Sequence, residues 1–463
     1  MTDALAAALR GVVGDTHVLD DRAVVASYES DWTGRFHGRA RLVVRPGTTD
    51  EVAAVLQQCA AAQVPVCVQG GNTGLVGASV PVDDAVLLST RRLTPIEPID
   101  EVAAQVTVGA GCPLVDLQQV ARAAGLDVGV DFAARESCTV GGMVATNAGG
   151  ERVLRYGTMR AQVAGIEAVL PDGTTVSRLT GLPKDNTGYD LMSLLAGSEG
   201  TLAVITRLRL RLVPLLPGRA VALVAVAGTT EAVELVRSMR AVPSLEAAEL
   251  FYADGLDLVR QHTGAAAPFA AAFPAYVLVE CAQQDDPSDD LLAALEAAGD
   301  LVLDATVASD GRGRAALWAY REAHTESINA AGVPVKLDVA VPLRALAETV
   351  EALPRVVGET APQARTILFG HVNEGNLHVN VLHAEAQDEA VTDAVLRLVA
   401  SHGGSISAEH GVGRAKRAWL SLSRSAAEIE MMRQVKAALD PRGLLNPGVL
   451  IDVNPDVASA EVR

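Results

Sequence analysis

The chain has 463 residues, of which 49% are hydrophobic, so it can bury enough core for two or three domains. The formal net charge of −18 disfavours nucleic acid and anionic lipid as partners of the surface as a whole. Five scattered cysteines form no C-x-x-C pair, which excludes a disulfide scaffold and suits a reducing compartment.

The sequence carries no targeting or membrane-spanning pattern. Asp3 interrupts the N-terminal stretch too early for a signal peptide, and no apolar run reaches the roughly 20 residues that cross a bilayer. We therefore expect a cytoplasmic protein. In so acidic a chain, an anionic substrate would need a local cluster of arginine and lysine side chains.

Residues 1–214 are expected to form one α+β domain, because helix and strand patterns alternate along them. Residues 48–63 have helical apolar spacing behind a threonine cap. An Asp-Gly dipeptide marks the turn of a hairpin over 166–179. The other expected elements are strands at 65–71, 86–90, 105–111 and 127–132 and a helix at 114–125.

Residues 215–402 are expected to form a second, substrate-binding cap domain, because strand patterns are repeatedly followed by helix patterns there. The strands are expected at 220–226, 275–282 and 335–342, and the helices at 229–240, 288–299 and 343–357. This layout predicts an antiparallel sheet with helices on one face. Residues 403–463 are expected to contain an amphipathic helix and to return to the first domain, completing the active site.

A glycine-rich loop follows the strand expected at 65–71. Four glycines fall within residues 69–77, so successive N–H groups can turn toward one anion, such as a pyrophosphate, without interference from Cβ atoms. The spacing matches neither the dinucleotide motif G-x-G-x-x-G nor the phosphate loop of nucleotide hydrolases, which disfavours a nicotinamide cofactor. A glycine-rich turn without a ligand is the alternative interpretation.

Two further segments, 139–150 and 196–202, combine small residues with hydroxyl groups where a helix or strand begins. Small residues allow a flat aromatic cofactor to lie on the backbone. Asn147 is polar in a segment expected to be buried, and the edge of a flavin ring could supply its hydrogen-bond partners.

The C-terminal part of the chain concentrates histidine, since five of the nine histidines fall within residues 371–410. In the strand pattern at 376–381, the period of two places Asn376, His378 and Asn380 on one face, which is expected to look into a site. A bend at 374–375 can bring His371 back toward His378.

Two imidazoles and one carboxylate with an open position are the ligand set of a catalytic divalent metal. We predict that His371, His378 and Glu409 hold such a metal, with zinc favoured over manganese, iron or cobalt. His410 is predicted to act beside it as the catalytic base. A structural histidine is the alternative in each case. It is adopted for His402, at a helix end, and for His383, on the apolar face.

A second cluster could bind a carboxylate. Arg321 and Thr325 are four residues apart and so share the face of a helix, and Lys336 lies on the following strand. Arginine can grip a carboxylate with two parallel hydrogen bonds, to which threonine adds a donor and lysine a charge. Surface ion pairs of Arg321 with Glu322 or Glu326 are the alternative.

Several motifs, in order between residues 45 and 206, together resemble the FAD-binding domain of the vanillyl-alcohol oxidase type. They are R-P-G-T-T-D-E-V, G-G-N-T-G-L-V-G, G-G-M-V-A-T-N-A-G-G, R-Y-G, K-D-N-T-G-Y-D-L and G-S-E-G-T-L. The resemblance implies a two-part FAD-binding domain whose loop at 70–77 carries the pyrophosphate. Covalent members often attach FAD through a histidine in that loop. Because Asn72 and Thr73 stand there, we expect non-covalent FAD.

The resemblance also implies which residues contact the cofactor. The expected FAD-binding residues are Gly70, Gly71, Asn72, Thr73, Gly74, Gly77, Ser137, Thr139, Gly142, Asn147, Glu199, Gly200, Thr201 and, near the C-terminus, Asn446.

The whole chain resembles the FAD-dependent D-2-hydroxyacid dehydrogenases, the branch of this class that acts on D-2-hydroxyglutarate, D-lactate or glycolate. The motifs are K-D-N-T-G-Y-D, R-E-x-x-T, V-K-L-D-V, G-H-x-x-x-G-N-L-H, S-A-E-H-G-V-G and D-P-x-G-L-L-N-P-G. In the D-2-hydroxyglutarate branch, the arginine and threonine of R-E-x-x-T and the following lysine hold substrate carboxylate. Arg321, Thr325 and Lys336 match them, and Asn376 is assigned to the substrate as well.

One departure from that branch is the pair Asn373-Glu374, where relatives often have Gly-Asp. The spacing of the expected metal ligands is untouched. The surroundings of the far end of the substrate are therefore expected to differ, which leaves the identity of the acid open.

We expect oxidation of a D-2-hydroxy acid, D-2-hydroxyglutarate first, to the 2-oxo acid by hydride transfer to flavin N5. D-lactate or glycolate, a flavoprotein oxidase or non-redox flavoenzyme, and a structural zinc site in a binding protein are the alternatives. The sequence has no NAD motif, iron–sulfur cysteines or second flavin loop, so electrons are expected to pass to an electron-transfer flavoprotein or a quinone. Chain length leaves the oligomeric state open, a homodimer included.

Overall fold

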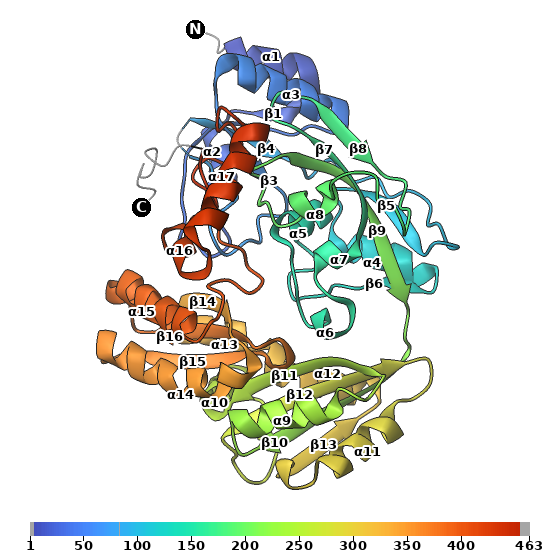
Figure 1. Ribbon diagram of the computed structural model, residues 1–463, viewed down its shortest axis with the longest axis vertical. Coiled ribbons are helices and arrows are strands. Elements are labelled where there is room, and N and C mark those ends of the chain that lie inside the picture. Colours follow the sequence, from blue (N-terminus) through green and yellow to red (C-terminus); the bar gives the residue numbers. More distant parts are fainter. Residues whose placement is uncertain (1–3, 83, 454–463) are drawn as a thin grey trace. The chain divides into compact units, whose positions relative to one another are not determined.

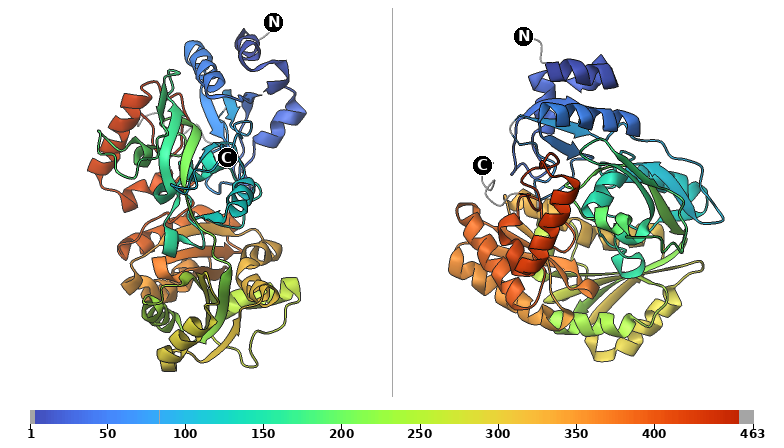
Figure 2. Two further views of the ribbon diagram at one scale, coloured as in Figure 1. Left: turned by 90° about the vertical axis from the view of Figure 1, so that its right-hand side faces the viewer. Right: turned by 45° about the horizontal axis from the view of Figure 1, so that its top comes forward.

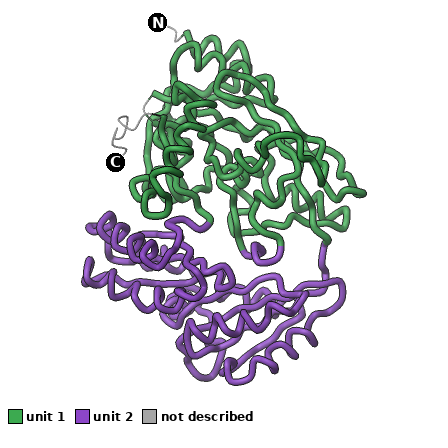
Figure 3. Tube along the Cα trace, viewed as in Figure 1, with its two compact units in different colours: residues 1–150, 156–214, 409–463 green, residues 151–155, 215–408 purple. Residues whose placement is uncertain are grey.

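The computed structural model describes residues 4–82 and 84–453, which form two compact units (Figure 3). Unit 1 comprises residues 1–150, 156–214 and 409–463, and unit 2 comprises residues 151–155 and 215–408. The chain stays in unit 2 beyond the expected boundary at residue 403, because Ser405 and Ala340 exchange backbone hydrogen bonds of 2.7 and 3.1 Å.

Unit 1 begins with a four-stranded sheet in the order β1-β2-β4-β3, whose last three strands run parallel. The expected threonine cap is confirmed, since the Thr48 hydroxyl accepts the Glu51 N–H at 3.1 Å. Buried residues of α1 and α3 pack on the sheet, among them Leu9 and Leu56. The elements are α1 (Ala4–Val13), β1 (Val18–Leu19), α2 (Arg22–Val25), β2 (Ala40–Val44), α3 (Thr49–Ala62), β3 (Val66–Gln69) and β4 (Ala85–Ser89).

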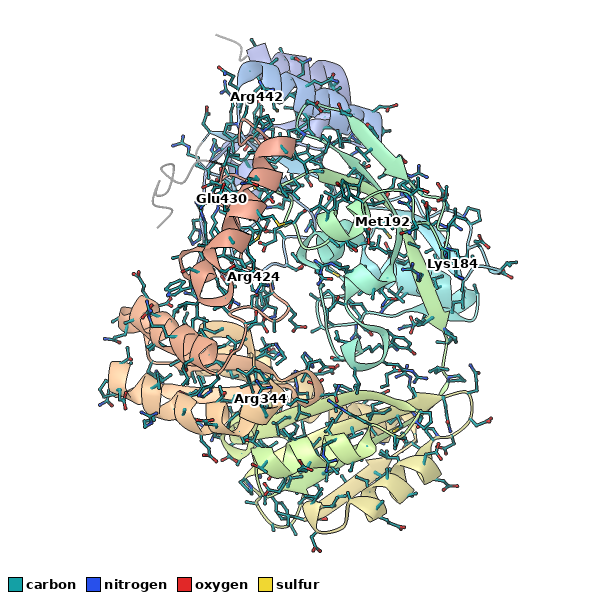
Figure 4. The ribbon with its side chains drawn as sticks, viewed as in Figure 1. Lys184, Met192, Arg344, Arg424, Glu430 and Arg442 are labelled. Atoms are coloured by element: carbon teal, nitrogen blue, oxygen red, sulfur yellow. The ribbon has the colours of Figure 1, made fainter. Side chains whose placement is uncertain are left out.

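A second, antiparallel sheet of unit 1 has the order β5-β9-β7-β8, with β6 also paired to β9. The expected hairpin is confirmed, because β7 and β8 pair antiparallel across the Asp172-Gly173 turn, where Gly173 has φ +85°. Met192, labelled in Figure 4, packs against the core of this sheet. The strands are β5 (Gln105–Gly109), β6 (Leu126–Val128), β7 (Val163–Val169), β8 (Thr175–Arg178) and β9 (Val204–Pro214). The helices are α4 (Leu114–Ala123), α5 (Val140–Thr146), α6 (Val153–Tyr156), α7 (Met159–Gln162) and α8 (Leu191–Leu195).

The C-terminal segment of unit 1 contains α16 (Leu420–Ser423) and α17 (Ala426–Leu439), which Figure 2 shows in red. Ser425 and Glu428 form a capping box at the start of α17, which stabilises the first turn of the helix. Val435 and Leu439 pack against the core of the β5–β9 sheet. The expected helix is thus present and packs within unit 1, while the expected division of the chain into domains stays a prediction.

Unit 2 contains a fully antiparallel sheet of seven strands in the order β13-β10-β12-β11-β15-β16-β14, as the sequence predicts. The chain-order neighbours β14 and β15 are separated in the sheet by β16. The strands are β10 (Gly218–Val226), β11 (Leu245–Tyr252), β12 (Ala275–Gln283), β13 (Asp304–Ala308), β14 (Val335–Ala340), β15 (Arg365–His371) and β16 (Asn376–Leu382).

Helices pack on both faces of this sheet. The helices α9, α11, α14 and α15 lie along one face (Figure 1), as predicted, but the sequence did not predict helices on the other face as well. The other face shares a core with α10, α12 and α13, to which Phe251, Leu317 and Ile328 contribute. The helices are α9 (Thr229–Met239), α10 (Ala253–Thr263), α11 (Ser288–Ala298), α12 (Gly311–Glu322), α13 (His324–Ala331), α14 (Leu343–Thr360) and α15 (Asp388–Ser401).

Candidate active site

The glycine loop at 70–77 begins where β3 ends, and it packs against the segment that leads into α5. A Cβ at Gly71 would lie 2.1 Å from the Ser137 carbonyl oxygen, and one at Gly70 would lie 2.4 Å from the Thr139 hydroxyl. By contrast, a Cβ at Gly74 would meet nothing within 4 Å. The loop therefore needs glycine for close packing on one side and leaves room for a ligand on the other.

The α5 segment completes this small-residue surface. Thr139 caps the helix and accepts the Gly142 N–H at 3.4 Å. Asn147 ends it in the left-handed conformation, with φ 52°, and its side-chain oxygen accepts the Arg160 N–H at 2.9 Å. These residues fit an FAD site, since two glycine-rich segments far apart in the chain meet at one surface.

Asn72 braces the glycine loop in place of the histidine used by covalent flavoproteins. It has φ 57°, its amide donates to the Ser30 carbonyl at 2.8 Å, and its side-chain oxygen accepts the Ser79 hydroxyl at 2.8 Å. Non-covalent binding of FAD stays a prediction.

The turn at 197–201 meets the C-terminal segment. The Glu199 carboxylate accepts the N–H groups of Val412 and Gly413, both at 2.8 Å. Asn446 bridges the turn to β3, since it donates to the Glu199 carbonyl at 2.7 Å and accepts the Val68 N–H at 2.8 Å. Burial raises the pKa of Glu199, although the two N–H groups act in the opposite direction. Glu199 and Asn446 thus hold segments of unit 1 together.

Thr201 is held by a buried lysine that the sequence analysis did not single out. The Lys436 ammonium donates to the Thr201 carbonyl at 2.6 Å, to the Leu445 carbonyl at 3.0 Å and to Asp440 at 2.5 Å. The Thr201 hydroxyl donates to the Ser198 carbonyl at 2.6 Å. The expected cofactor residues Glu199, Gly200 and Thr201 therefore sit in a rigidly bonded turn.

In unit 2, two histidines and two carboxylates form a row across four neighbouring strands. The register places Glu249 of β11 opposite His371 of β15, and Asp338 of β14 opposite His378 of β16. The ring centroids of His371 and His378 lie 5.4 Å apart. The predicted bend at 374–375, where Gly375 has φ 68°, brings the two rings together. From β11 to β14 the order of side chains across the sheet is therefore carboxylate, imidazole, imidazole, carboxylate.

Both histidines direct Nδ1 toward a buried carboxylate. His371 Nδ1 lies 2.5 Å from Glu249 Oε1, and His378 Nδ1 lies 3.6 Å from Asp338 Oδ1. A carboxylate that is hydrogen-bonded to Nδ1, as Glu249 is to His371, fixes the ring orientation and the tautomer and so directs Nε2 toward a metal. The 3.6 Å contact of His378 with Asp338 is an ion-pair distance and too long for a hydrogen bond. The arrangement is that of metal-binding histidines, although a structural role for each histidine is still the alternative interpretation.

Ala408 anchors the residues that follow it to this row. Its N–H donates to Asp338 Oδ2 at 3.1 Å, and Glu409 and His410 come next in the chain. Asp338, His378, Glu409 and His410 each offer one ligand atom, and these four atoms lie within 4.8 Å of one another. Imidazole nitrogens with carboxylate oxygens suit zinc and other divalent transition metals.

The structure therefore gathers two of the three predicted ligands, His378 and Glu409, in one group, with the predicted base His410 beside them. His371 is next to His378 but outside that group. The sequence analysis missed Asp338, although it lies two residues from Lys336 and so on the same strand face. The metal set itself stays a prediction.

The residues of the predicted carboxylate clamp do not lie on one helix, because Arg321 belongs to α12 and Thr325 to α13. The chain does not continue as one helix, because α12 ends at Glu322 and α13 begins at His324. Arg321 pairs with Glu249, through Nε and Nη2 at 2.8 Å each, and not with Glu322 or Glu326. Its guanidinium carbon also lies 4.5 Å above the Phe369 ring.

The other two clamp residues lie in different settings. Thr325 is exposed, in the first turn of α13. Lys336 is partly buried on β14 and lies in register with Asn380, which is 4% exposed. Asn380 was not assigned to the site from sequence, although the strand period had placed it on the same face as His378.

Asn376 holds Asp338 in place. Its amide donates to Asp338 Oδ1 at 2.7 Å and to the Val339 carbonyl at 3.2 Å. Asn376 is 5% exposed, and its side-chain oxygen has no hydrogen-bond partner among the described residues. Contact of Asn376 with substrate stays a prediction.

The two histidines interpreted as structural differ from expectation in their contacts. His402 ends α15, but its Nδ1 bonds to the Thr349 hydroxyl at 2.7 Å instead of capping carbonyls, because α14 packs beside α15. His383 lies one residue beyond β16 and is exposed, with φ 62°, so its expected place on the buried apolar face was wrong.

Glu374 lies in the bend between β15 and β16, beside the row. Burial raises its pKa to about 7, and the nearby Glu249 acts in the same direction while His371 opposes it. Glu374 Oε1 is buried without a hydrogen-bond partner among the described residues. Glu374 therefore places an acidic side chain close to the histidines, where relatives often have the shorter acid aspartate.

Comparison with known proteins identifies the family of the chain. The family model described as "FAD linked oxidases, C-terminal domain" matches residues 216–450, and the one described as "FAD binding domain" matches residues 40–178. The chain belongs to the FAD-linked oxidase family. As a member of the FAD-linked oxidase family, it is a flavoprotein oxidoreductase with an FAD-binding domain and a C-terminal antiparallel-sheet domain.

Relatives are similar over nearly the whole chain. A protein of Bos taurus named "D-2-hydroxyglutarate dehydrogenase, mitochondrial" is 40% identical over 96% of this chain and 82% of its own length. A protein of Xanthomonas citri pv. viticola named "D-2-hydroxyglutarate dehydrogenase" is 37% identical over 98% of both chains. The structure of p-cresol methylhydroxylase with substrate bound matches with a TM-score of 0.78 at 16% identity, over 98% of this chain and 97% of the other. That likeness supports the vanillyl-alcohol oxidase type of fold.

Two sequence interpretations concern the chain as a whole. All five cysteines are free and buried, as small hydrophobic residues would be. Among the described residues, no helix is both long and apolar enough to span a membrane.

Lys184, labelled in Figure 4, lies in the exposed part of the K-D-N-T-G-Y-D-L motif.

Proposed function

We propose that this chain is a metal-dependent dehydrogenase that oxidises a D-2-hydroxy acid, with D-2-hydroxyglutarate as the first candidate. The observation that carries the proposal is the row of Glu249, His371, His378 and Asp338, with Arg321 bonded to one end of it. The names of the relatives at 40% and 37% identity support the same substrate class.

The histidines and Glu409 would hold a divalent cation. His371 and His378 present imidazoles whose Nδ1 atoms are directed to carboxylates, and Glu409 adds a carboxylate oxygen. Such a cation would act as a Lewis acid and lower the pKa of the substrate hydroxyl group. We assign zinc to this role on the ligand types.

His410 would remove the proton of the substrate hydroxyl. It lies within the same group of side chains, with Nε2 3.7 Å from Glu409 Oε1. As the O–H proton goes to His410, the C2–H bond breaks and its electron pair leaves as hydride, so the C2–O bond becomes a carbonyl. Bound FAD supplies the acceptor for that hydride at its N5 atom, which no side chain can do.

Arg321 and Lys336 would hold substrate carboxylate. Glu249 occupies the Nε and Nη2 edge of the Arg321 guanidinium, and the edge that carries Nη1 is the one we assign to the substrate. Lys336 adds a positive charge from β14, on the strand face that also carries Asp338. Two anchoring points suit a dicarboxylic hydroxy acid better than a monocarboxylic one.

Electrons would then pass from reduced flavin to a separate acceptor. The sequence offers no second redox group, so we propose an electron-transfer flavoprotein or a quinone for this role.

The test is anaerobic reduction of the purified flavoprotein. Its visible flavin spectrum is followed on adding D-2-hydroxyglutarate, D-lactate, D-malate or glycolate, before and after treatment with EDTA. Bleaching by D-2-hydroxyglutarate that EDTA abolishes and zinc restores supports the proposal. A yellow protein that none of the acids bleaches rejects the hydroxyacid assignment. Unfolding on metal removal, followed by circular dichroism, would identify the metal as structural.

A further inference from the structure

Glu249 is a buried carboxylate that belongs to the row but has no assigned part in binding the metal, the substrate or the transferred proton. It lies on β11, is 1% exposed, and is in register with His371 on the neighbouring strand. The strand period places it on the same face as Phe251, which belongs to the core shared with α10, α12 and α13. A buried carboxylate at such a position is costly unless it is fully bonded.

Its two oxygens serve two different partners. Oε1 lies 2.5 Å from His371 Nδ1, while Oε2 accepts the Nε–H of Arg321 at 2.8 Å and lies 2.8 Å from Nη2 of the same ion pair. The Arg321 and His371 side chains are themselves about nine-tenths buried. Hydrogen bonds to a charged group are short and strong, and the planar guanidinium and imidazole fix the direction of each.

The surroundings compensate the charge of this carboxylate, because the Arg321 guanidinium lies against Oε2 with both Nε and Nη2 at 2.8 Å. Glu374 is the other acidic group near it. The Phe369 ring beneath the Arg321 guanidinium limits the orientations that Arg321 can take.

The geometry assigns Glu249 as a positioning residue that links the two halves of the proposed site, one predicted metal ligand and one predicted clamp residue. By accepting the His371 Nδ1–H it directs the Nε2 of that ring toward the metal. By binding the Nε and Nη2 edge of the Arg321 guanidinium, it leaves the Nη1 edge for the substrate. This inference rests on the proposed function, but its metal-binding part can be measured without any substrate.

The substitution Glu249→Gln tests these two contacts, because it changes the hydrogen-bonding groups of the side chain but hardly its shape. A glutamine offers one acceptor oxygen and one NH₂ donor group, whereas Glu249 accepts on both oxygens. Either His371 or Arg321 would then face a donor, and the two orientations of the amide would compete. One contact is lost whichever orientation wins.

Glu280 provides a matched control. It lies on β12 in the same sheet, is 8% exposed, and also divides its oxygens between an arginine and a ring N–H. One oxygen bonds to Arg219, and the other accepts the Trp318 indole N–H at 2.6 Å. Glu280→Gln therefore reproduces the general cost of removing a buried charge away from the histidine row.

The experiment measures zinc affinity of the metal-depleted, FAD-containing protein by competition with a chromophoric chelator, in wild type, Glu249→Gln and Glu280→Gln. We expect zinc to bind about 10- to 100-fold more weakly in Glu249→Gln, the usual effect of removing a partner of a metal-bound histidine. The KM for the hydroxy acid is expected to rise as well. In Glu280→Gln, both quantities should stay within about threefold of wild type.

Equal zinc affinities in wild type and Glu249→Gln would overturn the inference, as would an equal loss in Glu280→Gln or a wild type that binds no zinc. If Glu249→Gln does not fold, Glu249→Asp replaces it, because the shorter side chain keeps the charge but cannot reach both partners. If zinc binding depends on Glu249 but no hydroxy acid bleaches the flavin, the proposed substrate fails while the positioning role stands.

Discussion

Gly413 donates its backbone N–H to Glu199 Oε2 at 2.8 Å, although the two residues are 214 positions apart in the chain. The neighbouring Val412 N–H bonds to the other oxygen of the same carboxylate. Gly413 has φ 54°, and a Cβ there would lie 2.2 Å from the Val76 carbonyl oxygen in the glycine loop. Three motifs recognised separately in the sequence therefore meet within unit 1, directly after the predicted ligand Glu409 and the predicted base His410.

We predict that Glu199→Gln loosens the loop at 409–413. The amide replaces one acceptor by a donor that faces a backbone N–H, so at least one of the two hydrogen bonds is lost. Hydrogen exchange of peptides that cover Val412 and Gly413 should speed up by about 10-fold or more, in keeping with the roughly 1.5–3 kcal/mol of a hydrogen bond to a charged group. Mass spectrometry of the exchanged peptides measures this.

Glu167→Gln is the control for that prediction. Glu167 is a buried carboxylate of the same unit that accepts the Thr49 and Ser177 hydroxyls at 2.7 and 2.9 Å. Exchange at 412–413 should not change in this variant. Unaltered exchange in Glu199→Gln would show that the loop does not depend on the Glu199 carboxylate.

Arg321→Ala should raise the KM for the hydroxy acid by about 10-fold or more, because a charge-assisted contact to the carboxylate is removed. Zinc affinity should change by less than about threefold, since the contact of His371 with Glu249 remains. Steady-state kinetics with a dye acceptor measures the KM. Arg355→Ala, at an exposed position that forms an ion pair with Glu359, is the control. An unchanged KM in Arg321→Ala would reject the clamp.

His410→Gln should lower kcat by about 100-fold or more while leaving KM within about threefold, because a positioned base contributes about 10²- to 10⁴-fold. His402→Gln is the matched control, since His402 bonds to Thr349 away from the proposed metal group. Stopped-flow reduction of the flavin measures the chemical step. If His410→Gln also lost its zinc, His410 would be a ligand instead of the base.

The stability of unit 2 should fall as pH drops below about 6.5. His324 is fully buried between Phe251 and Phe369, and burial lowers its pKa to about 3. Because the unfolded chain binds a proton near pH 6.5 and the folded one does not, acid favours unfolding from pH 6.5 down to about pH 3. The loss from this group is about 1.4 kcal/mol per pH unit.

Urea unfolding at pH 7.0 and 5.5 tests that expectation. His324→Gln removes the titrating group, so its stability should depend less on pH than that of wild type, by about 1.4 kcal/mol over this interval. His262→Gln, at a partly exposed histidine near Glu326, should behave as wild type. Identical pH dependence in wild type and His324→Gln would contradict the buried, neutral state of His324.

Much of the site could be predicted because it depends on local patterns. The period of two along β16 placed His378 and Asn380 on one strand face, and the bend at Gly375 brought His371 beside His378, as expected. By contrast, the break between α12 and α13 went unpredicted. No proline or glycine interrupts residues 314–331, and the break falls next to buried His324, which packs against Phe251 and Phe369.

The sequence by itself determined the order and type of most elements, the glycine loop and the residue types that suit FAD and a divalent metal, because these depend on spacing along the chain. Only the tertiary structure decided which carboxylates face the histidines. Glu249 and Asp338 lie 122 and 40 positions before their histidines, and they reach them because the sheet order β11-β15-β16-β14 differs from the chain order. Register between strands distant in sequence is set by packing of the whole sheet, which no local pattern encodes.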